Sequence, residues 1–251
     1  MNWVIAIPSY NRVSILKERT LTMLESYNID KRKIFIFVVG GQQLEYSKNL
    51  HNDYNIVIGK KGISNQRAFI SEYFDEDRPI ISLDDDVKNL YEINKLKKLK
   101  KITCLKCLIY ETMYDMKSNK VNMCGFYPVP NPFFMKHNTS FNLKFCIGQF
   151  RIFFNKKSIE TSREYILLED YEMSLKYYLH DGRIMRYNNI CMSADYNKLA
   201  GGLKETTDRS YERKIQEVEA FYIQYSDYCF IKEKKNDIDI GLKESKSTIW
   251  T

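Results

Sequence analysis

Short apolar runs alternate with helix-like segments through residues 1–90, and this alternation limits the folds open to the chain. Each run is too short for a buried helix and ends at proline, glycine or aspartate, as buried strands do. The runs are WVIAIP (3–8), KIFIFVVGG (33–41), YNIVIG (54–59) and PIISL (79–83). Helix-like patterns at 9–29 and 62–74 separate them. This order is typical of an α/β fold with a Rossmann-like, mostly parallel central sheet flanked by helices.

Polar or glycine-rich segments follow the expected strands. In open α/β sheets, ligands bind outside the carboxyl ends of the strands. The sequence therefore predicts that these segments meet at one rim and form a binding site there. They are Pro8–Arg12, Gly40–Gly41, Gly62–Arg67 and Asp84–Asp86.

Three consecutive aspartates, Asp84 to Asp86, follow the last of these runs. Adjacent carboxylates repel one another, so the cluster calls for a cation or a special hydrogen-bonding role. One interpretation is a divalent metal that carries a nucleotide diphosphate. A P-loop is disfavoured because GxxxxGK[ST] is absent. The remaining interpretation is an acidic turn that caps a helix over residues 87–96.

The rest of the chain is less regular. We expect one long helix over 93–116, an extended loop over 121–135 and a strand pair within 145–157. A helix over 166–184 should end at Gly182, and a strand should follow to residue 194. A charged helix is expected at about 209–226, followed by a polar tail. No repeat, linker or sharp boundary divides the sequence, which predicts a single domain.

Charge and composition narrow the partners. The net charge is +7 and the pI about 8.9, which favours an anionic partner such as nucleic acid, a nucleotide or an acidic membrane surface. No apolar run approaches the ~18 residues of a membrane span, and the start lacks signal-peptide features, so we expect a cytoplasmic protein. The six cysteines are expected to be reduced, and Cys104–Cys107 lacks the partners of a zinc site.

Four motifs in order resemble glycosyltransferases of the GT-A fold, especially family 2-like enzymes. They are IPSYNR (7–12), GISNQRAFISEY (62–73), SLDDDV (82–87) and LLEDYEMSLKYYLHDG (167–182), and the resemblance covers about residues 3–185. It implies the GT-A fold and the transfer of a hexose or pentose from a nucleotide sugar to a hydroxyl acceptor. The reaction would depend on Mn²⁺ or Mg²⁺ and would invert the anomeric centre.

A narrower resemblance is to the phage glycosyltransferases called TET-associated, which are proposed to modify hydroxymethylated pyrimidines in DNA. It rests on the LDDDV block and on AGGL with a later arginine, Ala200–Leu203 and Arg209. It implies duplex DNA as the acceptor and the bacterial host cytoplasm as the location. A solvated helix face is the more ordinary interpretation of Lys97, Lys98, Lys100 and Lys101, and contact with DNA phosphates is the alternative.

The resemblance assigns roles residue by residue. Asp84 and Asp86 match the outer positions of a DxD motif and would hold the metal, while Glu169 and Asp170 match the catalytic pair. Asp170 would accept the proton of the acceptor hydroxyl, with Glu169 supporting it. Gly148 matches a glycine near the acceptor. The nucleotide sugar, most simply a UDP-sugar, would contact Pro8, Ser9, Tyr10, Arg12, Gly40, Gly62, Arg67, Asp84, Asp85 and Gly202.

Two departures from the family pattern concern the base and the metal. Relatives often carry an aspartate after the second strand that reads uracil, whereas this chain has Gly40–Gly41 and then Gln42. Many also carry a late histidine as a metal ligand; the corresponding stretch has none, and Asp195 or water could replace it.

The sequence therefore predicts one GT-A domain over residues 1–251. Residues 1–90 would form the nucleotide-sugar half, 91–205 the acceptor half, and 206–251 a C-terminal helix and tail. DNA carrying a hydroxymethylated pyrimidine is the first acceptor hypothesis. A glycan or lipid-linked acceptor is the second, and a nucleic-acid-binding protein with a degenerate site is the third.

Overall fold

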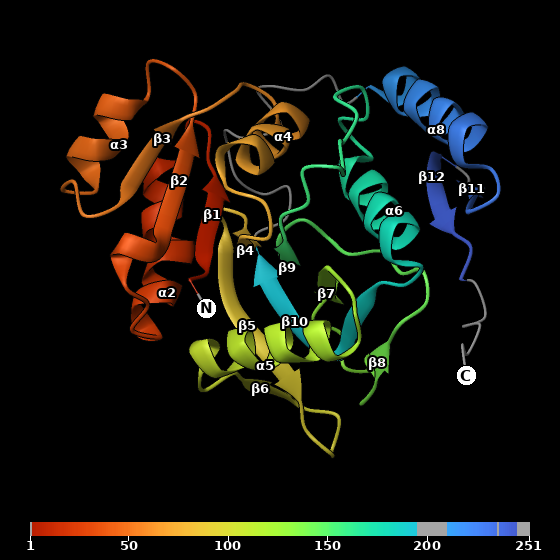
Figure 1. The fold of residues 1–251 in the computed structure, drawn as a ribbon, viewed down its shortest axis with the longest axis horizontal. Helices are drawn as coiled ribbons and strands as arrows, with labels where there is room; N and C mark the ends of the chain where they lie inside the picture. The colour runs from red at the N-terminus through yellow and green to blue at the C-terminus, as the bar shows by residue number, and fades with distance from the viewer. Residues whose placement is uncertain (1, 195–209, 235, 245–251) are drawn as a thin grey trace.

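The computed structural model describes residues 2–194, 210–234 and 236–244. A 10-stranded sheet forms the centre of the molecule (Figure 1), with β8 (Thr139–Ser140) joined to it through β10. The other strands follow one another across the sheet as β3 (Asn55–Ile58), β2 (Ile34–Val38), β1 (Val4–Pro8), β4 (Pro79–Leu83), β9 (Phe150–Phe154), β7 (Met123–Tyr127), β10 (Met185–Ala194), β5 (Val87–Ile93) and β6 (Leu99–Lys101).

The N-terminal half of the sheet is parallel. β3, β2, β1 and β4 pair in parallel, with Ile7 opposite Ile36 and Ile5 opposite Ile81. The inner strands are buried on both faces, which explains their nearly continuous apolar sequences. Beyond β4 the sheet is mixed: β9 is antiparallel to β4 and β7, while β7 and β10 are parallel.

Helices cover both faces of this sheet. Successive residues of β1 enter opposite cores, Ile5 and Ile7 on one side and Val4 and Ala6 on the other. The first core is covered by α1 (Val13–Leu16), the π-helical turn η1 (Lys17–Leu21), α2 (Thr22–Ser26), α3 (Gln43–Asn49) and α5 (Leu105–Ser118); the second by α4 (Ile63–Tyr73) and α6 (Glu169–Asp181). A 3₁₀ turn, η2 (Lys31–Lys33), leads into β2. The expected α/β class is confirmed.

A third layer lies outside α6. Helix α8 (Tyr211–Tyr225) and the antiparallel hairpin of β11 (Cys229–Lys234) and β12 (Asp237–Leu242) pack together at one edge of the molecule, blue in Figure 1. Phe221 and Val218 of α8 share a buried cluster with Leu175 of α6 and Leu168 before it. The expected helix is confirmed, and the tail that follows it forms a hairpin.

The region after the aspartates differs from expectation. Residues 87–93 form strand β5 and not a helix, so the aspartates do not cap a helix. Residues 93–104 were also expected to be helical, but β5 and β6 form a hairpin there and the helix begins only at Leu105. The residues between the strands turn because the Asn94 side chain accepts hydrogen bonds from the backbone of Leu96 and Lys98. A local side-chain-to-backbone turn of this kind competes with helix formation.

Three smaller expectations are also corrected. Part of the expected loop over 121–135 is strand β7, and the expected strand pair over 145–157 is the single strand β9. Cys104 and Cys107 form a disulfide at the start of α5, whereas we expected reduced thiols. The helix α6 does end at Gly182, whose left-handed conformation suits glycine. None of the helices in the described part of the chain is long and apolar enough to cross a membrane.

Candidate active site

The loops after β1 and β4 meet at one rim, as the strand order requires. These strands are neighbours in the sheet, so their carboxyl ends lie side by side. Ser9 Oγ, just after β1, donates to Asp85 Oδ2 over 2.8 Å and lies 2.8 Å from the Tyr46 hydroxyl. Tyr46 is a fully buried residue of α3, and its hydroxyl also accepts from the backbone N–H of Arg12. A buried hydrogen-bond network therefore holds the segment after β1, Ser9 to Arg12, against the aspartates.

Arg12 neutralises part of the aspartate cluster. Its Nη1 lies 3.2 Å from Asp85 Oδ1 and 3.8 Å from Asp86 Oδ2, and all three side chains are largely buried. Burial raises the pKa of Asp85 to about 7, against the opposing effect of Arg12 and of the Ser9 hydrogen bond. The neighbouring charges of Asp86 and Asp84 raise it further. Burial, more than repulsion between the aspartates, therefore disfavours the ionised form of Asp85.

A threonine from the π-helical turn holds the aspartate turn in place. Thr20 Oγ1 donates to the carbonyl oxygen of Asp84 over 2.7 Å and accepts from the backbone N–H of Val87 over 3.0 Å. The N–H of Asp84 donates to the carbonyl of Gln149. These bonds lock both ends of the aspartate segment, so the direction of its side chains is set by η1 and by the loop before β9.

Arg67 joins the two sets of carboxylates that the sequence assigned to opposite sides of the reaction. Its Nη2 lies 2.9 Å from Asp84 Oδ1, while its Nη1 pairs with Glu169 and Asp170 at the start of α6. The guanidinium is buried, and these carboxylates raise its pKa although burial alone would lower it. We expected Arg67 to meet phosphate or ribose; in this structure its contacts are carboxylates.

Gly148 allows this arrangement. A Cβ at position 148 would overlap the Arg67 guanidinium, so no larger residue fits without displacing it. Gly148, in the segment CIGQF, thus belongs to the site because its missing side chain leaves room for the Arg67 guanidinium. Ser64 Oγ, also on α4, donates to the carbonyl of Tyr165 and ties this helix to the segment before α6.

Arg151 is a residue of the site that sequence reasoning missed. It lies on β9, is 1% exposed, and places its Nη1 3.1 Å from Asp170 Oδ1 and its Nη2 3.6 Å from Glu169 Oε2. A buried arginine needs counterions, so the single arginine within the apolar run FRIFF was the available signal. Arg67 and Arg151 together hold the carboxylate pair from two sides.

The pKa values of the two carboxyl groups of the pair are shifted in opposite directions. Burial raises the pKa of Glu169, and the negative charge of neighbouring Asp170 raises it further. Together these effects outweigh the attraction of Arg67 and Arg151, which would lower it. Burial also acts on Asp170, but Arg67, a hydrogen bond from Glu169 and Arg151 together lower its pKa to about 2. Asp170 is the more exposed, at 22% of its side chain against 11% for Glu169. Asp170 is therefore an ionised carboxylate that is partly accessible to solvent.

The residues present fit a divalent cation that takes some of its ligands from the protein and the others from a bound substrate. Within the described ranges, no three His, Cys, Asp or Glu side chains gather as a complete metal site. Mg²⁺, however, is commonly held by one or two carboxylates together with phosphate oxygens and water. Asp84 and Asp86 offer hard oxygen ligands. Burial, which raises the pKa of Asp85 between them, disfavours the ionised carboxylates, and a bound cation would offset that cost.

The other residues that we expected to contact the nucleotide sugar lie around the same rim. Tyr10 follows Ser9 and lies beneath Lys61 Nζ, 5.9 Å from the ring centroid, and Gly62 precedes α4 with a φ of 88°. Gly40 follows β2, where Gln42 donates a hydrogen bond to Asn11. Gly202, together with Asp195 and the rest of the AGGL segment, lies outside the described residues.

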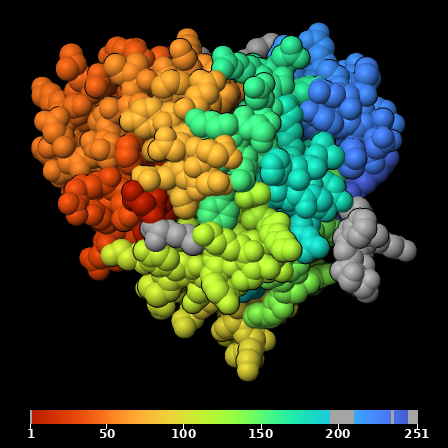
Figure 2. Space-filling view, viewed as in Figure 1, coloured from red at the N-terminus to blue at the C-terminus, as the bar shows by residue number. Residues whose placement is uncertain are grey.

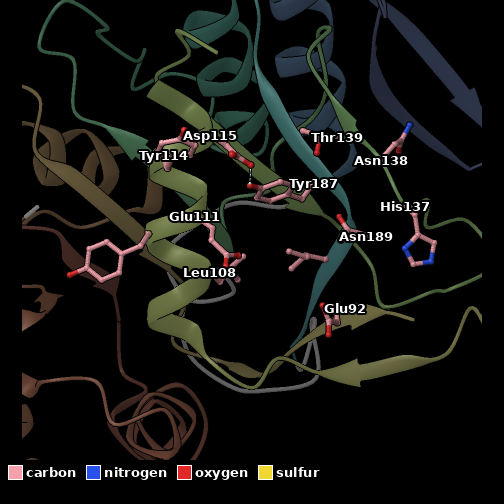
Figure 3. A pocket seen from close by; sticks show the side chains of 12 residues that line it. Glu92, Leu108, Glu111, Tyr114, Asp115, His137, Asn138, Thr139, Tyr187 and Asn189 are labelled. Atoms are coloured by element: carbon pink, nitrogen blue, oxygen red, sulfur yellow. Dashed lines mark hydrogen bonds between the residues drawn. The ribbon is translucent and has the colours of Figure 1, made fainter. Parts of the chain in front are cut away.

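A separate groove lies on the α5 side of the sheet (Figure 3). It has a volume of about 850 Å³ and includes none of the predicted site residues. Tyr114, Glu111 and Asp115 project into it from α5, and Tyr187 lies across from them on β10. Asp115 accepts a 2.6 Å hydrogen bond from the Tyr187 hydroxyl. The lining is acidic and aromatic, which is unlike the basic overall charge of the chain.

Comparison with known proteins identifies the fold. No family model and no curated protein sequence matches the chain. Among solved structures it is similar to S. aureus TarS 1-349, with a TM-score of 0.51 and 16% identity over 76% of this chain and 60% of that one. It spans 40% of the longer TarS structure. Glucosyl-3-phosphoglycerate synthase from Mycobacterium tuberculosis, in complex with Mn²⁺, UDP and glucosyl-3-phosphoglycerate, gives a TM-score of 0.53 and 7% identity over 96% and 86% of the two chains. The chain therefore has the fold of the GT-A glycosyltransferases.

Proposed function

We propose that this chain is a glycosyltransferase that moves a sugar from a nucleotide sugar to a hydroxyl acceptor, with inversion at the anomeric carbon. One observation carries the proposal: buried Arg67 joins Asp84 at the end of β4 to Glu169 and Asp170 at the start of α6. Within a GT-A fold, a carboxylate on the proposed donor side and a carboxylate pair on the proposed acceptor side thus face each other across the Arg67 guanidinium.

The donor is proposed to lie against the ends of β1, β2 and β4, within residues 1–90. Ser9, Tyr10, Arg12, Asp84 and Asp85 would contact it there. A UDP-sugar is the first choice, and the complex of the M. tuberculosis synthase with UDP supports it. Gln42 stands where relatives carry a base-reading aspartate, so it is the residue to vary in testing the choice of base.

Asp84 and Asp86 are proposed to hold Mn²⁺ or Mg²⁺ together with the diphosphate of the donor. When bound, the cation offsets the charge that develops on the leaving diphosphate. Arg12 already contacts Asp85 and Asp86, and in this role it would keep the aspartates oriented. The complex of the M. tuberculosis synthase with Mn²⁺ supports the choice of metal.

Asp170 is proposed to accept the proton of the acceptor. The hydroxyl oxygen forms a bond to the anomeric carbon, the bond from that carbon to the diphosphate oxygen breaks, and the proton passes to the Asp170 carboxylate. The products are the glycoside, the nucleoside diphosphate and a protonated Asp170. Glu169, Arg67 and Arg151 hold Asp170 in place, and its lowered pKa keeps it ionised before the transfer.

Duplex DNA with a hydroxymethylated pyrimidine is the proposed acceptor, bound by residues 91–205 and reached in the cytoplasm. The net charge of +7 and the resemblance of the LDDDV and AGGL segments support it. The four lysines proposed to track phosphates lie on the β5–β6 hairpin and not on a helix. Lys101 pairs with Tyr91, five residues along from Asp86, whereas Lys97 lies beyond the end of β5 at Ile93. Taking ~3.3 Å per residue, the lysines therefore lie from about 16 Å to more than about 23 Å from the aspartates, and only an acceptor that extends over this distance could touch both.

A glycan or lipid-linked saccharide is the second candidate acceptor. The α5 groove favours it, because tyrosine rings and carboxylates suit sugar hydroxyls and faces, whereas Glu111 and Asp115 would repel DNA phosphates. The groove therefore favours an uncharged acceptor, whereas the β5–β6 hairpin favours an anionic one.

One experiment separates the acceptors and tests the transfer. The chain is incubated with a mixture of nucleotide sugars and either hydroxymethylated DNA or a panel of glycans, and the products are analysed by mass spectrometry. A hexose or pentose increment on the base supports DNA, while an increment on a glycan supports the second candidate. EDTA and Asp86→Ala should abolish transfer, whereas Asp53→Ala, which removes a surface carboxylate far from the rim, should retain it. Transfer by Asp86→Ala in EDTA would exclude the proposed metal site.

A further inference from the structure

Two turns at the far end of β5 from the aspartates expose large apolar side chains. Leu96, between β5 and β6, is 76% exposed. Phe133 and Phe134, in the loop after β7, are 83% and 58% exposed. Scattered exposed apolar residues are ordinary, but residues gathered at one place mark an interaction surface.

The two turns are bound to each other. Lys97 Nζ, in the hairpin, donates to the carbonyl of Met135, and His137 Nε2 lies 3.0 Å from the carbonyl of Asn94. Beneath them, Met135 and Ile93 share a small buried cluster with Cys191 of β10. Leu96 and the two phenylalanines therefore belong to one continuous part of the surface.

Both turns are also internally fixed. The Asn94 side chain accepts from the N–H groups of Leu96 and Lys98. In the second turn, Asn131 Oδ1 accepts from the N–H of Phe133, and the Asn131 carbonyl accepts from Phe134 and Met135. The exposed side chains are thus presented on ordered backbone, which lowers the entropy cost of burying them in a partner.

Only positive charge accompanies these side chains. Lys95, Lys98 and Lys136 are exposed in the same two turns, and segments 93–103 and 128–140 contain no aspartate or glutamate. We call Leu96, Phe133, Phe134, Lys95, Lys98 and Lys136 the apolar–basic tip. In Figure 2 the hairpin is the yellow projection at the bottom of the molecule, so its part of the tip is convex.

We propose that the apolar–basic tip docks on an anionic lipid bilayer, without crossing it. At a bilayer interface, apolar side chains enter the acyl boundary while lysines stay at the phosphate level, so both kinds of residue are satisfied at once. A DNA duplex would satisfy the lysines, but Leu96 and Phe133 would face phosphates and sugars unless bases unstacked. A convex apolar apex also fits a deformable lipid surface better than a stiff duplex.

The proposal does not depend on sugar transfer, but it gives Lys98 a lipid partner in place of the DNA phosphates considered above. Binding can be measured on the full chain without any substrate. Co-sedimentation compares vesicles of phosphatidylglycerol mixed with phosphatidylcholine against vesicles of phosphatidylcholine alone. We expect binding to the anionic vesicles that weakens as salt is raised. Changing Lys95, Lys98 and Lys136 to Gln should weaken it by about a hundredfold, taking a factor of ~5 for each lysine. Changing Leu96, Phe133 and Phe134 to Ser should weaken it at least tenfold at every salt concentration.

Matched controls place the same changes elsewhere. Leu44 and Ile223 are 83% and 79% exposed on α3 and α8, so Leu44→Ser with Ile223→Ser tests whether any exposed apolar residue suffices. Lys17, Lys48 and Lys232, changed to Gln, remove the same charge away from the tip. The controls should bind as the unchanged chain does, and circular dichroism should show all variants folded.

Three outcomes would overturn the proposal. Binding to duplex DNA that depends on the tip, with none to vesicles, would make it a nucleic-acid surface. A change of oligomeric state in the serine variant, measured by light scattering, would make it a contact between two copies. Equal loss of vesicle binding in the tip and control variants would show that only total charge or total hydrophobicity matters.

Discussion

Arg67 is the residue on which the candidate site most depends. A buried guanidinium is stable only where carboxylates surround it, and removing one side of such a group leaves the other charge unpaired. Its partners lie just after β4 and at the start of α6, so a change at any of them affects both sets of carboxylates.

Changing Asp170 to Asn tests the proposed base. Asn keeps the size and the hydrogen-bonding oxygen but loses basicity, so donor affinity should survive while turnover falls ~10²- to 10⁴-fold. Steady-state kinetics and donor binding by calorimetry measure the two effects. If Asp170→Asn turns over normally and Glu169→Gln is inactive, the roles are exchanged; if neither is slowed, the assignment is wrong.

Changing Thr20 to Val tests the support of the aspartate turn. Valine has the same shape but leaves the N–H of Val87 without its acceptor, so the free energy of unfolding should fall by about 1–3 kcal/mol in urea titrations. Thr22→Val is the control, since the Thr22 hydroxyl donates only to an exposed carbonyl of Lys17. Its effect should stay within about 0.5 kcal/mol. Equal losses would deny Thr20 a special role.

The sequence could predict the rim but not every residue on it. Ser9, Asp84 and Asp170 follow or begin elements with strong local patterns, so their places could be predicted from strand ends and a helix start. The position of Arg151 within FRIFF indicated that it needs counterions but not which ones, because Glu169 and Asp170 lie on α6 and become its neighbours only when β9 and α6 pack together. The contact of Gly148 with Arg67 likewise arises only from tertiary packing and has no local sequence pattern.

At the scale of elements, the β5–β6 hairpin shows where periodicity misleads. Leu96, Leu99, Ile102 and Leu105 recur every three residues with lysines between them, which resembles an amphipathic helix. Only Leu105 is in a helix, while Leu99 lies in β6 and Leu96 is exposed. The Asn94 turn and the pairing of β5 with β10 outweigh the local helical pattern, and that pairing joins residues about a hundred positions apart.

The start of α6 contains a buried carboxyl whose titration should be visible in stability. Burial raises the pKa of Glu172, against hydrogen bonds from the N–H of Ser162 and from Lys176. The folded chain therefore holds this proton more tightly than the unfolded chain, whose glutamates titrate near ~4.3. The stabilisation is complete below that pH and is lost as pH rises through the folded value.

Glu172→Gln should remove this dependence. The difference in free energy of unfolding, variant minus unchanged chain, should increase as pH rises from about 4.3 to the folded pKa of Glu172, and then level off. Urea unfolding at several pH values measures the difference. Glu45→Gln, an exposed change on α3, should show no such trend; the same trend there would assign the effect to overall charge.

At the scale of the molecule, the C-terminal layer supports helix α6, which begins with Glu169 and Asp170. Glu217 of α8 accepts a 2.7 Å hydrogen bond from the N–H of Leu167, just before Glu169, and Tyr165 bonds to Gln224. Phe221 fills the centre of the contact and is fully buried. The layer thus fixes the segment that leads into the carboxylate pair.

Phe221→Ala tests this coupling. The cavity should reduce the free energy of unfolding by about 3–5 kcal/mol. Turnover should fall with it, measured at a temperature where the variant remains folded by circular dichroism. Ile223→Ala, two residues along on the exposed face, should change stability by less than about 0.5 kcal/mol. Normal turnover in a destabilised Phe221→Ala would separate the layer from the site.

The span of the Arg67 contacts also bears on how the chain is made. Its partners Glu169 and Asp170 are more than a hundred positions away, so at ~5–20 residues per second a ribosome adds them about 5–20 s after Arg67. Until then a buried guanidinium would lack most of its counterions, which disfavours closing the core around it. Residues 1–90 should therefore fold only after α6 has been made. A fragment of residues 1–100 should give the circular dichroism of an unfolded chain, and a cooperative unfolding transition in that fragment would show that the first half folds without the second.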